Sequence, residues 1–373
     1  MSPKRILVVT QDFPPETGGI QSYMFELASH FHQRGHQVTV ICPGARNTPS
    51  PLPPEVEVIR VRIHSSWLFL PLMFRLPRML RERGFTHVVY AQWQGFLSEL
   101  LLPRKAVQHQ SLCLVCGREL LTSVLIPFHK ILCRFSFRRI DVAVPISGAV
   151  EALLRETGRP RGKIARVHPG VDPVRFHPVD AGFLRTRYDL EEGPVILSMA
   201  RMVHRKGMDV LVRSFARVLQ SVPSAWLVLG GDGPESSTLR ALAVELNVAD
   251  RVRFPGRIPE EELAAHYSLA SVFALPSRQG PRDVEGFGIV YLEAGACEIP
   301  VVGTRTGGVV DAVQDGITGL LVPQEDVEAL TTALFRLLEN PEEAREMGMA
   351  ARRRIVSTLT WESTGDKFLE AMD

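Results

Sequence analysis

Short apolar runs alternate with longer amphipathic segments along this chain. The runs RILVVT (5–10) and QVTVIC (37–42) flank IQSYMFELASHFHQRG (20–35), in which apolar residues recur at three- and four-residue spacing. Short apolar runs are typical of buried strands, and the longer pattern is typical of an amphipathic helix. The pattern therefore predicts strand, helix, strand, the unit from which parallel α/β sheets are built.

Two such series follow one another. The first continues with expected strands at VEVIRVRI, THVVYAQ, CLVC and IDVAVPIS, and the second begins at PVILSMA (194–200) and ends at TGLLVP (318–323). Between them, PGVDPVRFHPVDAGF (169–183) is rich in Pro and Gly and is interpreted as a linker. We therefore predict two doubly wound α/β domains, at 1–175 and 176–355, followed by a helical segment at 356–373.

The composition agrees with two folded domains. At 373 residues the chain is too long for one ordinary core, and 45% hydrophobic with 23% charged residues is typical of a soluble globular protein. No signal peptide is evident, and the stretch WLFLPLMF (67–74) is far shorter than the roughly 20 residues of a membrane-spanning helix. Five cysteines, an odd number, indicate reduced thiols and a cytoplasmic protein.

The charge is unevenly distributed. Residues 1–175 carry 23 Lys and Arg against 12 Asp and Glu, whereas the remainder carries 20 against 29. Two segments of the basic half, 67–83 and 127–141, interleave arginines with aromatic residues. This pattern suits a peripheral membrane segment, and also nucleic acid. The alternative is that the apolar residues face the core while the arginines cover the surface.

Three glycine-rich turns follow or precede expected elements: PPETGGIQ, GGDGP and EGFGIV. None matches G-x-G-x-x-G or G-x-x-x-x-G-K-[ST], the usual sequence motifs of dinucleotide-binding proteins and P-loop NTPases. The turns therefore do not favour either class. A glycine before a helix nevertheless leaves backbone N–H groups available to an anion.

Cations lie in the loop ARMVHRKG (200–207). Arg201 and Lys206 follow an expected strand, at the sheet edge where ligands of open α/β sheets bind. A diphosphate there could take a bidentate contact from Arg201 and a point charge from Lys206. Arg205 is interpreted as a solvated surface residue.

Glu285 and Glu293 lie eight positions apart on either side of an expected helix start near Gly288. As a pair they are too far apart for one metal ion, and no Asp-x-Asp accompanies them. They suit hydrogen bonds to hydroxyls at the two ends of an elongated ligand such as a sugar nucleotide. The alternative is that Glu293 is an ordinary helix residue.

Taken together, these features resemble glycosyltransferase family 4, retaining enzymes of the GT-B fold. The resemblance rests on Glu285-x7-Glu293, Arg201 with Lys206, and the segments GGDGP, TGGVVDAVQDGITGLLVP and HPGVDPVRFHP. QDFPPETGGIQSY and DVEGFGIVYLEA resemble the phosphatidylinositol mannosyltransferase type. The implied fold is α/β: two doubly wound, Rossmann-like domains facing a cleft, acceptor-binding first and nucleotide-sugar-binding second, with the last helix crossing back to the N-terminal domain.

The resemblance also implies roles for residues. Arg201 and Lys206 would bind the donor diphosphate and, with Glu285, support catalysis. Glu285 and the N–H groups of Gly286 to Gly288 would hold the transferred sugar and phosphate, and Glu293 would bind the ribose. Further donor-site positions would be Gly18, Gly19, Arg257, Ile258, Phe287 and Ile289. No metal and no cofactor is expected, because cations and a helix N-terminus neutralise the leaving diphosphate.

One position departs from the family. Such enzymes usually place a histidine before Gly in an HG-x-E turn near the sugar, whereas this chain has Cys116 in CGRE (116–119). A thiol is a weak hydrogen-bonding substitute for an imidazole. The departure leaves open a tolerated change, an altered substrate or rate, or a loss of catalysis.

The resemblance thus implies a retaining hexosyltransferase in the cytoplasm, and the basic first half favours association with the inner face of the membrane. Its donor would be GDP-mannose and its acceptor a membrane lipid or lipid-linked glycan, with no nucleic acid partner. One alternative is a transferase that uses a UDP-sugar and a polysaccharide or small-molecule acceptor. The other is a catalytically impaired nucleotide-sugar-binding protein.

Overall fold

The computed structural model describes residues 3–15, 18–45, 48–62, 69–100, 102–103, 107–125, 127–280 and 283–373. The contacts divide the chain into two compact units, 1–169 with 361–373 and 170–360. Residues 170–175 and 356–360 thus belong to the second unit rather than to the neighbouring segments to which the sequence pattern assigned them. The reason is that Val171 pairs with Thr360 in a β-bridge and donates its N–H to the Leu359 carbonyl at 2.9 Å.

The described residues of the first unit form one parallel sheet of seven strands in the order β3-β2-β1-β4-β5-β6-β7. The strands are β1 (Arg5–Val9), β2 (Gln37–Pro43), β3 (Glu57–Val61), β4 (His87–Tyr90), β5 (Gln110–Val115), β6 (Val142–Pro145) and β7 (Lys163–Ile164). All but the short β7 lie where the apolar runs predict strands. The central β1 is apolar throughout after Arg5 because helices cover both faces of the sheet.

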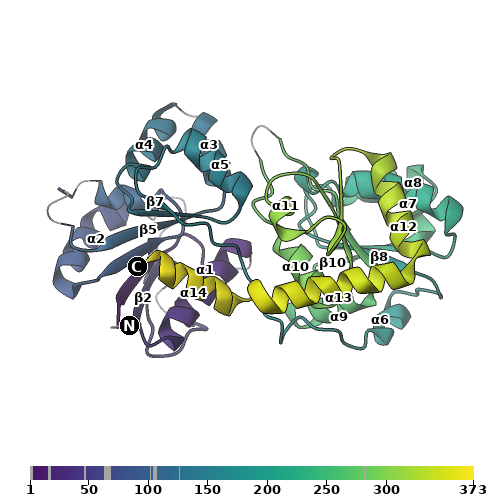
Figure 1. The fold of residues 1–373 in the computed structure, drawn as a ribbon, viewed down its shortest axis with the longest axis horizontal. Coiled ribbons are helices and arrows are strands. Elements are labelled where there is room, and N and C mark those ends of the chain that lie inside the picture. The colour runs from purple at the N-terminus through teal and green to yellow at the C-terminus, as the bar shows by residue number, and fades with distance from the viewer. Residues whose placement is uncertain are drawn as a thin grey trace. The chain divides into compact units, whose positions relative to one another are not determined.

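The helices of the first unit are α1 (Gly19–Gln33), α2 (Phe69–Arg83), α3 (Arg118–Leu125), α4 (Pro127–Phe137), α5 (Gly148–Thr157) and α14 (Trp361–Ala371). A short 3-10 helix, η2 (Gly95–Glu99), follows β4. Figure 1 shows α3, α4 and α5 on one side of this sheet and α1 with α14 on the other. The sheet is therefore doubly wound, as predicted.

The last helix, α14, is part of the first unit although it follows the whole second unit in the sequence. Its apolar face packs on α1, where Phe368 contacts Phe31 and Trp361 meets Tyr23 edge to face, with ring centroids 5.9 and 5.4 Å apart. The Asp366 carboxylate lies 2.8 Å from His30 Nε2 at the rim of this contact. The predicted return of the last helix to the N-terminal domain is confirmed.

The described residues of the second unit form a parallel sheet of six strands in the order β10-β9-β8-β11-β12-β13. The strands are β8 (Val195–Met199), β9 (Trp226–Gly230), β10 (Val252–Gly256), β11 (Val272–Leu275), β12 (Val301–Thr304) and β13 (Gly319–Val322). The helices are α6 (Gly182–Arg187), α7 (Met208–Ser221), α8 (Ser236–Glu245), α9 (Leu263–Leu269), α10 (Ile289–Ala296), α11 (Val309–Ala312), α12 (Val327–Glu339) and α13 (Pro341–Thr358), with short 3-10 turns η4 (His204–Lys206), η5 (Ala249–Arg251) and η6 (Glu260–Glu262).

The interpretation of 169–183 as a linker is wrong in part. Val171 is buried in the second unit, and Phe176 packs edge to face on Tyr267 with ring centroids 6.0 Å apart. α6 then begins at Gly182. Pro and Gly interrupt regular structure here, but the apolar side chains between them still find a core.

Among the described helices of both units, none has the length and apolar character needed to cross a lipid bilayer.

Candidate functional site

The centre of the second sheet is a topological switch point. β8 lies beside β11, and the chain proceeds from β8 to β9 on one side and from β11 to β12 on the other. The connections leave the two strands in opposite directions, and ligands of open α/β sheets bind beyond the carboxyl ends of strands at such a point. The described residues of the loops that meet there are 200–207 after β8, and 276–280 with 283–288 after β11. Six of the candidate site residues lie in these loops: Arg201, Lys206, Glu285, Gly286, Phe287 and Gly288.

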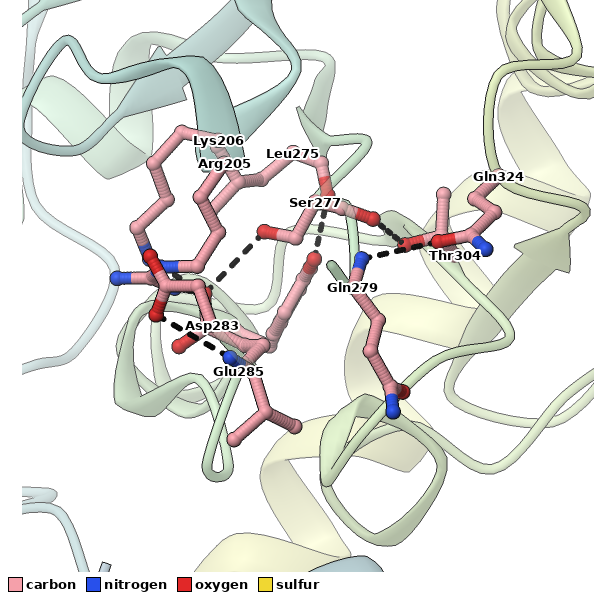
Figure 2. Close-up of polar contacts among 11 residues, drawn as sticks. Arg205, Lys206, Leu275, Ser277, Gln279, Asp283, Glu285, Thr304 and Gln324 are labelled. Carbon is pink, nitrogen blue, oxygen red and sulfur yellow. Dashed lines mark hydrogen bonds and ion pairs between the residues drawn. The ribbon is translucent and has the colours of Figure 1, made fainter. Parts of the chain in front are cut away.

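The carboxylate of Glu285 holds these two loops together (Figure 2). Its Oε2 accepts hydrogen bonds from Lys206 Nζ and Arg205 Nη1, both at 2.6 Å, and from Ser277 Oγ at 3.2 Å. Only 8% of Glu285 is exposed to solvent. A buried carboxylate is stable when it is both paired and hydrogen-bonded, and both conditions are met here.

Two opposing effects determine the pKa of Glu285. Burial raises it, whereas the charges of Lys206 and Arg205 and the hydrogen bonds from Lys206 and Ser277 lower it. The pKa lies below its ordinary value, so the cations prevail over desolvation. Glu285 is therefore ionised at neutral pH, and it holds the side chains of Lys206 and Arg205 beside it.

Arg205 corrects an expectation from the sequence. It is not a solvated surface residue, because its guanidinium bridges Glu285 and Asp283, with Nε 3.0 Å from Asp283 Oδ2. Neighbouring residues on a regular helix would diverge by about 100°. The tight turn η4 instead directs both the Arg205 and the Lys206 side chains at one carboxylate, which a local pattern does not reveal.

Arg278 is a second residue that the sequence analysis missed. Its backbone N–H donates to the Arg205 carbonyl at 2.7 Å, and its guanidinium donates to the His204 carbonyl at 2.8 Å. The same guanidinium forms a bidentate pair with Asp209, both distances being 2.6 Å, and an ion pair with Glu325. Arg278 thus fixes the loop after β8 to the loop after β11. A single arginine in PSRQG has no local signal for this role.

Glycines permit the close approach of the loops. Gly207 has φ +65°, and a Cβ there would lie 2.0 Å from the Pro276 carbonyl oxygen. Gly308 donates its N–H to the Glu285 carbonyl at 2.8 Å, and a Cβ at Gly308 would lie 2.0 Å from the Gly286 carbonyl oxygen. Side chains at these two positions would push the loops apart. The TGG turn after β12 is therefore a support for the Glu285 loop.

The predicted sugar- and phosphate-binding positions Gly286 to Gly288 lead into α10, which begins at Ile289, a further donor-site candidate. Gly288 is the N-cap, in the left-handed conformation with φ 90°, and no described side chain caps the helix start. Phe287 is buried and anchors this turn. A helix start of this kind suits an anion, since the first N–H groups have no partner within the helix.

Glu293 lies within α10, away from Glu285. Its Oε2 accepts a hydrogen bond from the Tyr267 hydroxyl at 2.5 Å, and burial raises the pKa of Glu293 above its ordinary value. The two glutamates therefore occupy separate environments, one beside two cations and one beside a phenol. The ribose-binding role of Glu293 stays a prediction.

The other donor-site candidates of the second unit lie at the same edge of the sheet. Arg201 follows β8 and is exposed, and Arg257 and Ile258 follow β10. Ile258 packs near the end of β9, since a Cβ on Gly230 would lie 3.2 Å from its Cγ1. The structure thus places these three residues beyond the carboxyl ends of strands.

The candidates of the first unit lie at the equivalent edge of its own sheet. Gly18 is the N-cap of α1 and Gly19 its first residue. Cys116 directly follows β5, and Glu119 accepts its N–H at 2.7 Å and the Gly117 N–H at 3.2 Å. Burial raises the pKa of the Cys116 thiol well above its ordinary value, so Cys116 presents a neutral thiol.

No group of three or more His, Cys, Asp or Glu side chains in the described parts of the chain is arranged to hold a metal ion. The expectation of catalysis without metal or cofactor stays a prediction.

Two protein-family models match this chain, one in each unit. The model "Glycosyl transferases group 1" matches residues 183–354, and the model "Glycosyltransferase Family 4" matches residues 17–175. A GDP-mannose-dependent alpha-(1-6)-phosphatidylinositol monomannoside mannosyltransferase of Mycolicibacterium smegmatis is 37% identical over 98% of each chain. A protein of the same description from Mycobacterium tuberculosis is 35% identical over 98% of this chain and 97% of its own length.

Solved structures show the same fold. Sucrose-phosphate synthase from Thermosynechococcus elongatus superimposes with a TM-score of 0.83 at 26% identity, covering 98% of each chain. Anabaena HepE, solved with UDP and glucose, gives a TM-score of 0.79 at 17% identity, covering 99% of each chain, which is a likeness of fold alone. The predicted GT-B fold is confirmed.

The lowered pKa of Glu285 predicts a pH dependence of stability. The folded state binds fewer protons than the unfolded state between the folded pKa and about 4.3, the ordinary value of Glu. Wild type should therefore have a higher free energy of unfolding than Glu285→Gln. This difference should be complete above that pH and should decrease as the pH falls through the folded pKa. Urea unfolding of both proteins across pH 3–7 measures this difference. Glu245→Gln, at an exposed position, is the control; a difference between wild type and Glu285→Gln that does not vary with pH would contradict the prediction.

The Arg278 contacts predict a second effect on stability. Arg278→Met leaves Asp209 and the His204 carbonyl without their partner and should lower the free energy of unfolding by about 2 kcal/mol or more. Arg305→Met is the matched control, because the Arg305–Asp315 pair is exposed and should contribute less than about 1 kcal/mol. Urea unfolding at neutral pH compares the two variants. Equal effects would show that Arg278 does not hold the loops together.

Proposed function

Since the chain belongs to glycosyltransferase family 4, we propose that this hexosyltransferase transfers mannose from GDP-mannose to a hydroxyl of a membrane lipid or lipid-linked glycan. The observation that carries the proposal is the cluster of Lys206, Arg205 and Glu285 at the switch point of the second sheet. The donor is proposed from the relatives whose names include GDP-mannose dependence, which match this chain over 98% of its length.

The cations of the second unit would bind the donor diphosphate. An ammonium has three N–H donors. Lys206 donates one hydrogen bond to Glu285, so its other N–H groups can bind phosphate oxygens. Arg205 and the exposed Arg201 add guanidinium donors at the same edge, and Arg guanidinium matches phosphate geometry. Together with the start of α10, these groups form a site for two adjacent negative charges.

Catalysis would come from preorganised charge. As the bond between the sugar and the diphosphate breaks, negative charge increases on the leaving group, and cations already in position stabilise it without reorganisation. Glu285 holds Lys206 and Arg205 in place, and Arg278 holds their loop. The acceptor hydroxyl would attack from the face that the diphosphate leaves, which gives retention, and no metal would be needed.

The acceptor would be held by the first unit. Two relatives of the chain are named phosphatidylinositol monomannoside mannosyltransferases. A lipid headgroup is therefore the proposed acceptor class, and the inner face of the cell membrane is the proposed location. Cys116 stands where the family places a histidine beside the sugar. This difference favours one second candidate, a nucleotide-sugar-binding protein without transfer activity.

The donor proposal predicts selective stabilisation by guanine nucleotides. GDP and GDP-mannose at about 100 times their Kd should raise Tm by about 5 °C, because ligand binding to the folded state adds to stability. UDP, ADP and their hexose conjugates at equal concentrations are the matched controls. Selective stabilisation by UDP compounds would show that the donor is a UDP-sugar rather than GDP-mannose. Binding of GDP-mannose without transfer would favour the second candidate, the binding protein without transfer activity.

The site proposal predicts a large loss of transfer in Lys206→Ala. Removing one preorganised charge from a leaving-group site should lower kcat/KM by about 100-fold or more. The assay follows mannose incorporation into phosphatidylinositol monomannoside dispersed in detergent. Arg213→Ala, an exposed cation on α7, is the control and should retain wild-type rates. Wild-type rates in Lys206→Ala would refute the assignment of the site.

A further inference from the structure

The carboxylate of Glu293 has one oxygen bonded within the protein and one oxygen open. Its Oε2 accepts the Tyr267 hydroxyl at 2.5 Å, and none of the described residues donates a hydrogen bond to Oε1. Glu293 is partly exposed, as are Ile289 and Val290 at the start of α10, whereas the two residues between them and Glu293 are buried. Residues four apart share a helix face, so Glu293 lies on the face of Ile289, about 6 Å further along the axis.

The phenol of Tyr267 is the donor in this hydrogen bond. Burial and the charge of Glu293 raise the pKa of Tyr267 well above its ordinary value, so the hydroxyl keeps its proton at neutral pH. Burial also raises the pKa of Glu293, and the hydrogen bond from Tyr267 opposes this effect because it stabilises the ionised carboxylate. Tyr267 thus fixes the direction of the carboxylate and favours its charged form.

The Tyr267 ring is itself held on two sides. It packs on Phe176 and Phe273, with ring centroids 6.0 and 5.7 Å away. Phe176 belongs to HPGVDPVRFHP, a segment for which the proposed function gives no role. Arg175 of the same segment donates to the Glu260 carbonyl at 3.1 Å, in the loop after β10. The segment therefore supports Tyr267 on one side and the loop after β10 on the other.

We propose that Tyr267 is a positioning residue that holds Glu293 toward the ribose hydroxyls of the donor nucleotide. The inference rests on the proposed function, in which the donor is a nucleotide sugar. It goes beyond that function because it assigns a role to a buried residue outside the loops that carry Lys206 and Glu285. The motif around Phe176 would then serve the nucleotide site through Tyr267.

The position of Glu293 suits a ribose. The start of α10 is the proposed diphosphate site, and Glu293 lies about one turn beyond it. The loop after β10 carries the donor-site candidates Arg257 and Ile258, which would face the base. Glu260 of that loop is close enough to raise the pKa of Glu293. Ribose joins the diphosphate to the base in every nucleoside diphosphate, so a carboxylate between the two segments would meet its hydroxyls.

The chemistry fits a vicinal diol. An ionised carboxylate only accepts hydrogen bonds, and the ribose 2′- and 3′-hydroxyls are adjacent donors. Such charge-assisted bonds are stronger than neutral ones. They would form when the donor binds and persist while the sugar is transferred, so their loss should raise KM and leave kcat unchanged. Loss of Lys206, which acts on the leaving group, should lower kcat instead.

Calorimetric titration of wild type and Tyr267→Phe with GDP and with 2′,3′-dideoxy-GDP tests the proposal. Wild type should prefer GDP by about 10-fold or more, because the dideoxy analogue lacks both donors to the carboxylate. Tyr267→Phe keeps the ring contacts, and should bind GDP about 5-fold more weakly but dideoxy-GDP as wild type does. Glu293→Gln should lose most of the preference for GDP.

Tyr188→Phe is the matched control. It removes a phenol hydroxyl that is bonded to His266 Nε2 at 2.8 Å on the same helix, α9, and should bind both nucleotides as wild type does. In the transfer assay, Tyr267→Phe should raise the KM for GDP-mannose about 5-fold and change kcat by less than about 2-fold. A merely structural role for Tyr267 would not separate the two constants in this way.

The pH profile reports how Tyr267 acts. A protonated Glu293 is a weaker acceptor, so the preference for GDP over dideoxy-GDP should decrease as the pH falls through the pKa of Glu293. Without the phenol that pKa is higher, so the decrease should begin at a higher pH in Tyr267→Phe. Tyr267, Arg175, Glu260 and Cys297 are the titratable and charged groups that act on Glu293, and only Tyr267 changes. Phosphate titration affects both nucleotides and cancels in the ratio.

Two results would overturn the proposal. One is an equal preference for GDP over dideoxy-GDP in wild type and Tyr267→Phe, with the same pH profile. The other is an equal loss of affinity for both nucleotides in Tyr267→Phe, because this would show a general effect on the fold rather than on the ribose contact.

The outcomes separate this inference from the proposed function. If Tyr267→Phe selectively weakens GDP binding but wild type transfers no mannose, the function fails and the role of Tyr267 stands. If the same selectivity is found with UDP and dideoxy-UDP instead, the donor base is corrected and the role of Tyr267 stands. If mannose transfer is normal and the selectivity is absent, the role of Tyr267 fails and the function stands. A wild type that binds no nucleoside diphosphate would overturn both.

Discussion

The pairing of a buried carboxylate with two adjacent cations is the interaction on which the second unit's site depends. Burial opposes the ionisation of Glu285, and Lys206 and Arg205 would repel each other without that carboxylate. Each charge therefore requires the others. The result is a pair of cationic side chains held in fixed directions at a sheet edge, which is the arrangement that an anionic leaving group requires.

The loops around this pairing are themselves constrained. Arg278 joins the turn that carries both cations to the end of β11, and Gly207 and Gly308 let backbone approach backbone where a side chain would intrude. Such contacts make the site a property of the loops rather than of any single residue. The parallel sheet determines this arrangement, because its switch point brings the loops after β8 and β11 to the same edge.

The first unit is also built on a parallel sheet, but its loops and covering helices differ from those of the second unit. Its loop glycines Gly18 and Gly19 begin α1, and Glu119 orders the turn at Cys116 by accepting two backbone N–H groups. Its sheet is covered on one face by a helix from the end of the chain, so 361–373 contribute to a core that 3–169 begin. On the other face, α4 buries Cys133, Ser136 and Phe137 and exposes Phe128, Ile131 and Phe135.

The sequence by itself determined the fold class and the positions of most strands, because short apolar runs report burial on both faces of a parallel sheet. It also located Arg201, Lys206 and Glu285 near the carboxyl ends of strands, since loops that follow strands in such a sheet share one edge. The sequence did not assign Arg205 or Arg278 their roles. Both act on groups 47 to 80 positions away, and only the tertiary structure brings those groups within hydrogen-bond distance. The exposure of Phe128 and Phe135 beside the buried Phe137 was also decided by packing, because the same residue type serves a core or a surface according to what the fold places against it.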